Sequence, residues 1–316
     1  MKRLTQCLIF CLLMVTHSLF ANNYPTRNIE VIVPYAAGGG TDLVARAFVE
    51  MANKHLPHNM GVVNKTGGGG AVGLTEIVTA RPNGYKIGIG TVELTMLPNL
   101  GLVHWKATDV IPIALLNAEP AAISVNANAP WSNYQEFIDY AKENPDKIRI
   151  GNSGSGAIWH IAAEALGEKT GAKFKHIPYA GANPAVTELL GGHIEAVTVS
   201  PAEVISHVKN GSIKILAVMS EQRVEQFPDV PTLKELGVDL SISTWRGLVV
   251  PPNTSPAIQQ KLAEVAAKVG NDPEFIAALE KMNVTPVYLD SESFAEIIKK
   301  DNLFFQQIMQ KLGLVQ

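Results

Sequence analysis

The sequence alternates short β-rich runs with helical stretches, and it does so in two series. The first series opens on residues 29–34 and the second on residues 121–125. In each series a run of apolar and β-branched residues leads through a loop into apolar residues at helical spacing, as in 41–54. Strands that alternate with helices form right-handed parallel crossovers, with helices on both sheet faces. The pattern therefore predicts an α/β protein in which each lobe is a mostly parallel sheet flanked by helices.

The chain has 316 residues, and the roughly 295 that remain without the first 21 are too many for one ordinary core, so length also favours two lobes. We expect residues 22–120 and 246–316 to form lobe 1 and residues 121–245 to form lobe 2, with the last helices packing back on the first series. Further strands are expected at 61–64, 86–90, 148–151, 174–177, 196–199, 213–218 and 246–250. Further helices are expected at 73–80, 133–143, 158–169, 184–190, 202–209, 256–270, 273–282 and 292–312.

The first 21 residues are typical of a secretory signal peptide. Lys2 and Arg3 precede an apolar run over residues 4–15, which is too short for a stable membrane-spanning helix. Small residues follow, and we expect cleavage after Ala21, with cleavage after Ser18 or an uncleaved anchor as the alternatives. The leader predicts export, and we expect the mature protein in the periplasm.

Both cysteines of the chain, Cys7 and Cys11, lie in this leader. A mature chain without thiols excludes a disulfide framework, a cysteine nucleophile and a thiolate metal site. Without Lys2 and Arg3 the chain keeps 24 of its 26 basic residues against 29 acidic ones, a formal charge of −5. No basic patch stands out, so we do not expect nucleic acid as a partner. The eight histidines show no metal-binding spacing, and we expect neither a metal nor a cofactor.

Two loops, at residues 33–42 and 151–158, share one layout. Each follows a predicted strand, is rich in glycine or small residues, and opens a helix. Glycine lets a ligand approach the backbone, and a helix start offers free N–H groups and a partial positive charge. Either loop alone is better explained as a tight turn, but one per lobe predicts an anion-binding cleft between the lobes. The candidate ligand-binding residues of these loops are Tyr35, Ala37, Gly38, Gly39, Thr41, Asp42, Ser153, Ser155, Ala157 and Ile158.

Several of these side chains also have a purely structural interpretation. Asp42 falls in a first helical turn, where a carboxylate favours the helix dipole. Ser153 and Ser155 either donate to a ligand carboxylate or cap the helix. His160 suggests a general base, yet no nucleophile elbow accompanies it, so a packed or capping histidine is the better interpretation. The spacing needed for a dinucleotide fingerprint or a P-loop is absent from the sequence.

Two further loops follow predicted strands and are candidate walls of the cleft. They carry Thr91 and Glu93 in one case and Ser200 and Glu203 in the other. The two glutamates could form an acid/base pair or bind a cationic group, and they could equally be first-turn carboxylates of their helices. The sequence does not separate these alternatives.

Taken in order, a set of short motifs resembles the extracytoplasmic receptors of tripartite tricarboxylate transporters, the Bug family, from about Tyr24 to the C-terminus. The motifs are Val33-Pro34-Tyr35 with Gly38-Gly39 and Asp42; Asn64 before a glycine run; Pro82-Asn83-Gly84-Tyr85; Gly154 and Gly156 with His160; Pro178-Tyr179 and Gly181; Leu189-Leu190-Gly191-Gly192; Pro228-Asp229-Val230-Pro231-Thr232; and Trp245 with Gly247-Leu248.

This resemblance implies a two-lobe, periplasmic-binding-protein-like fold of type II that closes on its ligand. It also implies that the loops of Tyr35 to Asp42 and Ser153 to Ile158 grip a carboxylate through backbone amides and ordered waters. We therefore expect no enzyme but a monomeric receptor for a di- or tricarboxylate, which hands it to the large and small membrane subunits of a transporter. The alternatives are a ligand sensor for a membrane kinase and a hydrolase that uses Ser153 with His160.

Overall fold

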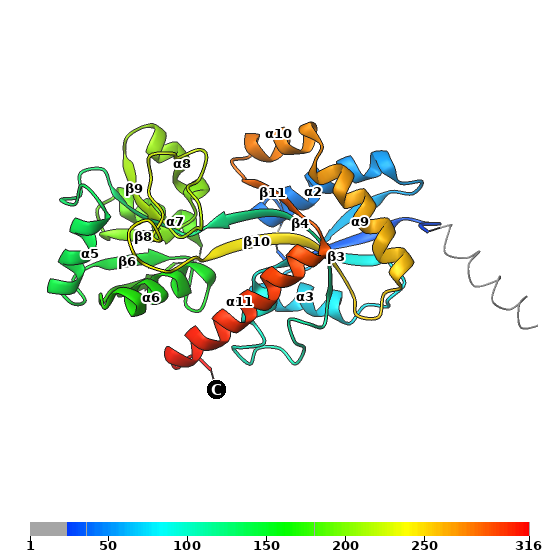
Figure 1. Cartoon of the computed structure of the whole chain (residues 1–316), viewed down its shortest axis with the longest axis horizontal. Coiled ribbons are helices and arrows are strands. Elements are labelled where there is room, and N and C mark those ends of the chain that lie inside the picture. Colours follow the sequence, from blue (N-terminus) through cyan, green and yellow to red (C-terminus); the bar gives the residue numbers. More distant parts are fainter. Residues whose placement is uncertain (1–23, 36, 180, 316) are drawn as a thin grey trace, which may run out of the picture.

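The computed structural model describes residues 24–35, 37–179 and 181–315, and Figure 1 shows them as two α/β halves side by side. The predicted signal peptide lies outside the described residues. Within the described part of the chain, no helix is both long and apolar enough to cross a membrane.

The first sheet has six strands in the order β11-β4-β10-β3-β1-β2. They are β1 (Ile29–Val33), β2 (Met60–Asn64), β3 (Lys86–Thr91), β4 (Ile111–Pro120), β10 (Ser243–Val250) and β11 (Pro286–Leu289). Strand β1 pairs in parallel with β2 and β3, whereas β10 runs antiparallel to both β3 and β4. The first predicted series thus forms the parallel edge of this sheet, and strands from the rest of the chain complete it.

Helices cover both faces of the first sheet, because its strands alternate their side chains between two apolar cores. Val31 packs with α2 (Gly40–Ala52), α9 (Pro256–Gly270) and α10 (Pro273–Lys281), while Ile32 packs on the opposite side. That second core includes side chains of α3 (Ala71–Val78), α4 (Glu93–Met96) and α11 (Ser291–Lys311). Short 3₁₀ turns precede β2 and α3, at Asn53–His55 and Gly68–Gly70.

The second sheet has five strands in the order β7-β6-β8-β5-β9. They are β5 (Ala122–Asn126), β6 (Arg149–Asn152), β7 (Lys175–Pro178), β8 (Ala196–Val199) and β9 (Ile213–Val218). Strand β6 is parallel to β7 and β8, and β5 is antiparallel to β8 and β9. The helices of this half are α5 (Tyr134–Glu143), α6 (Ile158–Thr170), α7 (Ala182–Leu190) and α8 (Pro201–Lys209).

The α/β class and the two-lobe architecture are confirmed, with one refinement. Each sheet is mixed rather than mostly parallel, because strands that return between the halves enter each sheet in the opposite direction. The predicted lobe boundaries at 120/121 and 245/246 stay a prediction. The chain changes sheets between β4 and β5 and again between β9 and β10.

Two strands, β4 and β11, were not expected from the sequence. Strand β4 contains Pro112, Asn117, Glu119 and Pro120, which are unfavourable in an isolated strand. Its stability comes from pairing with β10, from Ile111 beside Val250 to Pro120 beside Ser243. Strands β4 and β10 are long and connect the two halves in Figure 1.

Candidate ligand-binding cleft

Both glycine-rich loops lie at the edge of their sheet that faces the other half of the molecule. The first loop follows β1, which is parallel to β3, and β3 ends at Thr91 beside Arg246 near the start of the crossing strand β10. The second loop follows β6, which is parallel to β8, and β8 ends beside the start of β5. The topology therefore brings the two predicted loops to the same boundary between the lobes.

The first loop exposes its backbone and buries its carboxylate. Ala37, Gly38 and Gly39 are exposed, and Gly38 has a φ of 80°, which favours glycine. Asp42 is only 1% exposed. It accepts hydrogen bonds from the Gly38 amide at 2.8 Å, from Arg46 Nε at 2.8 Å and from Asn64 Nδ2 at 2.9 Å. Asp42 therefore orders the loop rather than presenting its carboxylate to a ligand.

Helices α2 and α6, which the two loops open, both start without a side-chain cap. Their N-cap residues, Gly39 and Ala157, carry no side chain that could accept from the first amides, and none of the described residues supplies a side-chain cap. Helices α5, α10 and α11 begin at Asn133, Asp272 and Asp290, whose side chains accept from the first turn. Other helices also lack a side-chain cap, namely α3, α4, α7 and α9, so the position of α2 and α6 is what distinguishes them. The uncapped starts leave N–H donors and positive dipole ends at the lobe boundary.

The second loop is held by two hydrogen bonds to its own amides. Asn152 Oδ1 accepts from the Gly154 amide at 3.0 Å, and His160 Nδ1 accepts from the Gly156 amide at 3.1 Å. The capping function considered for Ser153 and Ser155 is wrong, because the N-cap of α6 is Ala157 and no side chain caps it. His160, as expected, is a packed residue that bonds the loop. Among the described residues no hydrogen bond joins it to Ser153, so the hydrolase pair is not formed.

Tyr35, Thr91 and Glu93 meet behind the first loop. Thr91 Oγ1 donates to Glu93 Oε2 at 2.6 Å and lies 3.5 Å from the Tyr35 hydroxyl. Burial and the nearby Glu93 charge raise the pKa of Tyr35 well above its usual value. Gly70 allows this packing, because a Cβ there would stand 2.9 Å from the Tyr35 hydroxyl oxygen. Glu93 thus lies in the first turn of α4, bonded to its own loop.

Ser200 and Glu203 pair with each other at the start of α8. Glu203 Oε2 accepts from the Ser200 amide at 2.7 Å and from its hydroxyl at 3.1 Å. Burial, followed by the neighbouring Glu119 charge, raises the pKa of Glu203. Ser200 is fully buried. This arrangement matches a first-turn carboxylate that stabilises its helix, and it leaves the predicted role in ligand binding as a prediction.

Arg246 is the central side chain that the sequence-based prediction missed. Its Nε donates to Thr41 Oγ1 at 3.0 Å, and its Nη1 donates to Asn117 Oδ1 at 3.0 Å. It also faces Glu119, which is 6% exposed and whose pKa is raised by burial. Arg246 therefore places a cation beside the start of α2. The only sequence signal was a charged residue next to Trp245, at the start of the apolar strand predicted at 246–250.

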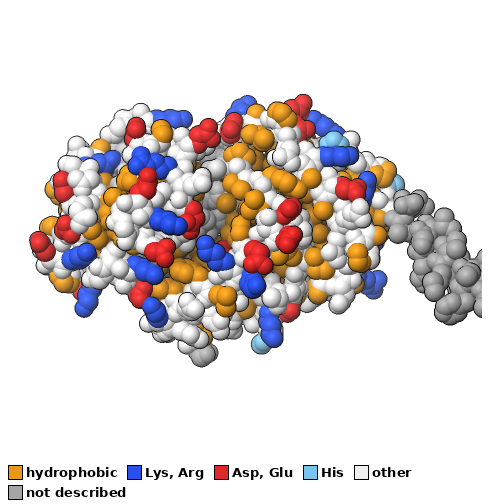
Figure 2. All heavy atoms as spheres, viewed as in Figure 1, with side chains coloured by type: hydrophobic (Ala, Val, Ile, Leu, Met, Phe, Trp, Pro, Cys, Tyr) orange, Lys and Arg blue, Asp and Glu red, His pale blue; other side chains and the backbone are white. Residues whose placement is uncertain are grey.

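The surface is hollowed between the halves, between α8 and α10 in the view of Figure 2. A pocket of about 270 Å³ lies there, with Pro201 and Ile205 of α8 on one side and Glu280 and Thr285 on the other. Pro201 and Ala202, between the candidate residues Ser200 and Glu203, line this pocket, but none of the candidate ligand-binding residues does. We therefore treat it as a neighbour of the predicted cleft.

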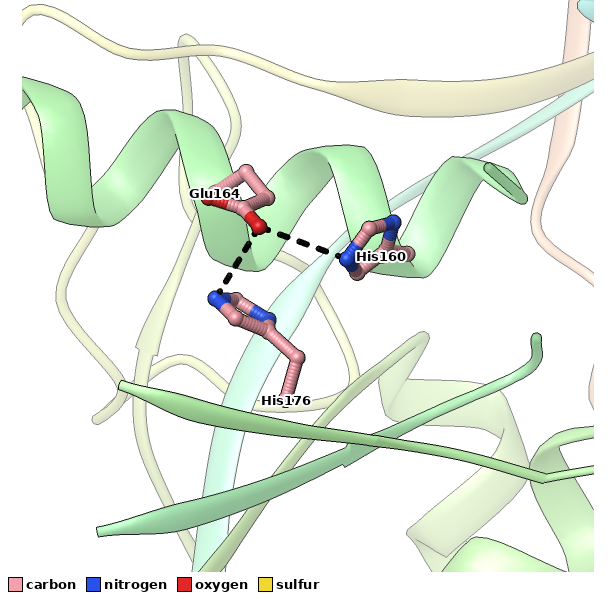
Figure 3. Close-up of side chains that lie close together, drawn as sticks. All are labelled: His160, Glu164 and His176. Carbon is pink, nitrogen blue, oxygen red and sulfur yellow. Dashed lines mark ion pairs between the residues drawn. The ribbon is translucent and has the colours of Figure 1, made fainter. Parts of the chain in front are cut away.

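Three further polar side chains gather next to the second loop. His160 and Glu164 of α6 and His176 of β7 point toward one another, as Figure 3 shows. The Glu164 carboxylate lies 3.4 Å from His160 Nε2 and 3.3 Å from His176 Nε2. Along the sequence the histidines show no metal-binding spacing, so this cluster was not expected. The missed signal was the i, i+4 spacing of His160 and Glu164, which places both on one helix face.

Comparison with known proteins identifies the family. The family model described as "Tripartite tricarboxylate transporter family receptor" matches residues 44–314. The chain belongs to this family. A Cupriavidus necator protein of the UPF0065 group, encoded in the gbd 5′ region, is 35% identical over 301 residues, covering 94% of this chain and 90% of the relative. The receptor family consists of solute-binding proteins rather than enzymes, which confirms the expected class.

Solved structures of solute-binding proteins share the receptor's fold. A TctC solute-binding protein from Polaromonas has a TM-score of 0.85 at 48% identity, covering 92% of this chain and all of that chain. The periplasmic binding protein BugD has a TM-score of 0.75 at 30% identity, with 92% and 99% covered. Two Rhodopseudomonas palustris proteins, one with adipate and one with bound malate, have TM-scores of 0.79 and 0.74 at 22% and 21% identity, over 93% and 90% of this chain and 99% of each of theirs.

Proposed function

We propose that this receptor captures a small di- or tricarboxylate in the periplasm and delivers it to the large and small integral membrane subunits of a tripartite transporter. One observation carries the proposal. Helices α2 and α6 start uncapped at the boundary between the lobes, one from each half. A dianion that lies between them satisfies both sets of amides at once, and no cationic side chain is required.

The surroundings of the two helix starts support this proposal. Arg246 lies against Thr41 of the first helical turn and adds positive charge there. The family resemblance implies that ordered waters bridge the carboxylate and the loops. Two proteins of the same fold have adipate and malate with them, which supports a small dicarboxylate as the ligand class. We further propose that the receptor acts as a monomer, since one chain contributes both loops.

The amide grip can be tested with a matched pair of substitutions at Gly40, the first helical residue of α2. Gly40→Pro removes one N–H donor, while Gly40→Ala keeps it and adds a comparable Cβ. The helix tolerates proline at this position, and Gly39 has the extended backbone that precedes proline (φ −77°, ψ 163°). In either variant the new Cβ meets only Arg246 side-chain atoms, the nearest at 3.1 Å.

We expect calorimetric titration with a panel of C3–C6 di- and tricarboxylates to find one that binds with a dissociation constant in the micromolar range or below, about −8 kcal/mol or stronger. Gly40→Pro should weaken this binding by about tenfold or more relative to Gly40→Ala, at equal thermal stability, because a hydrogen bond to a charged group contributes about 1.5–3 kcal/mol. Ile158→Pro with Ile158→Ala tests α6 in the same way. Binding of no carboxylate, or equal affinity in both members of each pair, would contradict the proposal.

A further inference from the structure

The cluster of His160, Glu164 and His176 lies outside the proposed carboxylate grip but touches it. His160 and Glu164 are one turn apart on α6, and His176 reaches them from β7 (Figure 3). The potential ligand atoms, one from each residue, all lie within 4.8 Å of one another. All three side chains are half-buried, so they are held in place and still accessible to a small ion.

The distances within the cluster suit a shared metal ion. Glu164 Oε1 lies 3.4 Å from His160 Nε2 and 3.3 Å from His176 Nε2. An ordinary N–H···O hydrogen bond has its atoms about 2.9 Å apart, so these contacts are long. Two ligands about 2.0–2.1 Å from a tetrahedral Zn²⁺ are about 3.3–3.4 Å apart. Glu164 Oε1 thus lies at the ligand-to-ligand spacing of such an ion from each of the two ring nitrogens.

The immediate surroundings leave the negative charge of Glu164 without a Lys or Arg partner. Across the described residues its ion-pair contacts are His160 and His176 alone. His176 Nδ1 is buried and has no hydrogen-bond partner there, so no contact fixes the tautomer of this ring. A metal at His176 Nε2 would replace the 3.3 Å contact of that nitrogen with Glu164, and no hydrogen bond of Nδ1 would be lost.

We propose that His160 Nε2, Glu164 Oε1 and His176 Nε2 bind a divalent transition-metal ion of the Zn²⁺ class, with water completing the coordination. Two imidazoles and one carboxylate form a donor set that suits such ions better than it suits Ca²⁺ or Mg²⁺. A surface hollow of about 450 Å³, lined by Glu164 and His176, gives the ion a path to the site.

The hydrogen bond of His160 to the second loop links this metal site to the proposed carboxylate grip. His160 Nδ1 accepts from the Gly156 amide, so that nitrogen carries no proton. A neutral ring that binds a metal through Nε2 carries its proton on Nδ1, and this proton then opposes the Gly156 N–H. Metal binding therefore breaks a bond that orders the loop. Where the proposed function holds, metal and carboxylate weaken each other's binding by the same factor.

The test uses the tag-free mature chain without carboxylate, so that its outcome does not depend on the proposed function. Titration with Co²⁺ is followed by visible absorption, and Zn²⁺ is measured by calorimetry. His176→Gln and Glu164→Gln each remove one ligand. The matched control is His193→Gln, because His193 also pairs with a glutamate, Glu188 at 2.8 Å, but at an exposed two-residue contact.

We expect one ion per chain, with affinity reduced more than about tenfold in His176→Gln and Glu164→Gln and unchanged in His193→Gln. Thermal unfolding confirms that the variants fold. If His176→Gln does not fold, the wild type decides, because Co²⁺ should broaden the ring NMR signals of His160 and His176 and spare those of His193. Absence of ion binding, or equal affinity in all variants, would overturn the site.

Discussion

At the scale of single residues, burial decides which polar side chains can act on a ligand. Asp42 and Thr91 are 1% and 2% exposed, and their hydrogen bonds to neighbouring loop residues fully occupy them. Although burial raises it, hydrogen bonds from Arg46, Gly38 and Asn64 hold the pKa of Asp42 below its usual value. Such residues organise the loop backbone: Asp42, for example, takes up the Gly38 amide. That a ligand contacts the exposed backbone of Ala37 to Gly39 stays a prediction.

Asp301 should make the stability of the protein depend on pH. It accepts a hydrogen bond from Trp245 Nε1 at 2.7 Å, and burial raises its pKa from 3.8 to about 6. Because the folded pKa exceeds the unfolded value, the stability from this group is fully present below about pH 4 and is lost as the pH rises through about 6. The difference between a pKa of 3.8 and one of about 6 corresponds to roughly 3 kcal/mol in the free energy of unfolding.

Asp301→Asn keeps an acceptor for the indole and removes this pH dependence. The free energy of unfolding should be measured with urea at pH 4 and pH 7.5 for both proteins. From the lower to the higher pH, the difference between variant and wild type should change by about 2–3 kcal/mol in favour of the variant. Asp290, at the start of the same helix, provides a control of opposite sign, because hydrogen bonds from Ser293 lower its pKa. A parallel pH profile of Asp301→Asn and wild type would contradict the assignment.

At the scale of elements, the close approach of α3 to β1 depends on Gly73. A Cβ at this position would stand 2.5 Å from Pro34 Cα and 2.7 Å from the Lys65 carbonyl oxygen, both in backbone that cannot easily move. Because Pro34 belongs to the first loop, this contact sets the position of α3 directly against that loop. The small side chain at residue 73 is therefore a packing requirement of the site.

Gly73→Ala should lower the free energy of unfolding by about 1–3 kcal/mol, because overpacking outweighs the better helix propensity of alanine. The matched control is Gly61→Ala in β2, where a Cβ meets nothing within 4 Å. Urea unfolding of both variants measures the difference. Equal stability of the two variants would show that α3 shifts without cost.

At the scale of the whole molecule, the halves are joined in a way that permits closure. Strands β4 and β10 are paired along their length and cross together. Helix α11 also meets the second half: Ile308 and Met309 are buried in an apolar core that continues into that half, and Lys311 Nζ lies 2.6 Å from Glu168 Oε1. An exposed ion pair of this kind contributes little to stability. We expect the lobes to move about the crossing strands, with the apolar contacts of α11 as a second connection between them.

Ligand binding should therefore close the lobes and stabilise the fold together. With the best carboxylate at 100 times its dissociation constant, the radius of gyration measured by small-angle X-ray scattering should fall, and the free energy of unfolding should rise by about 2.7 kcal/mol. Gly40→Pro at the same concentration should show a smaller change in both. Stabilisation without a change in the radius of gyration would mean that the receptor binds without closing.

The sequence by itself determined the features that depend on neighbouring residues. Period-2 and period-3.6 apolar patterns predicted most strands and helices, because each element buries one face or stripe. Glycine-rich turns between strand and helix predicted both loops, since left-handed backbone and helix starts are local properties. Motif order identified the receptor family.

Only the tertiary structure decided the contacts between distant segments. Strand β4 exists because β10 pairs with it, and Arg246 meets Thr41 from 205 residues away. His176 joins His160 and Glu164 only because β7 lies beneath α6. No local pattern encodes such pairs, because their contacts exist only once a particular strand order brings the distant segments together. The carboxylate grip could be predicted because a helix start is a local feature of the sequence. The charge near the grip and the neighbouring cluster of two histidines and a glutamate arise from packing.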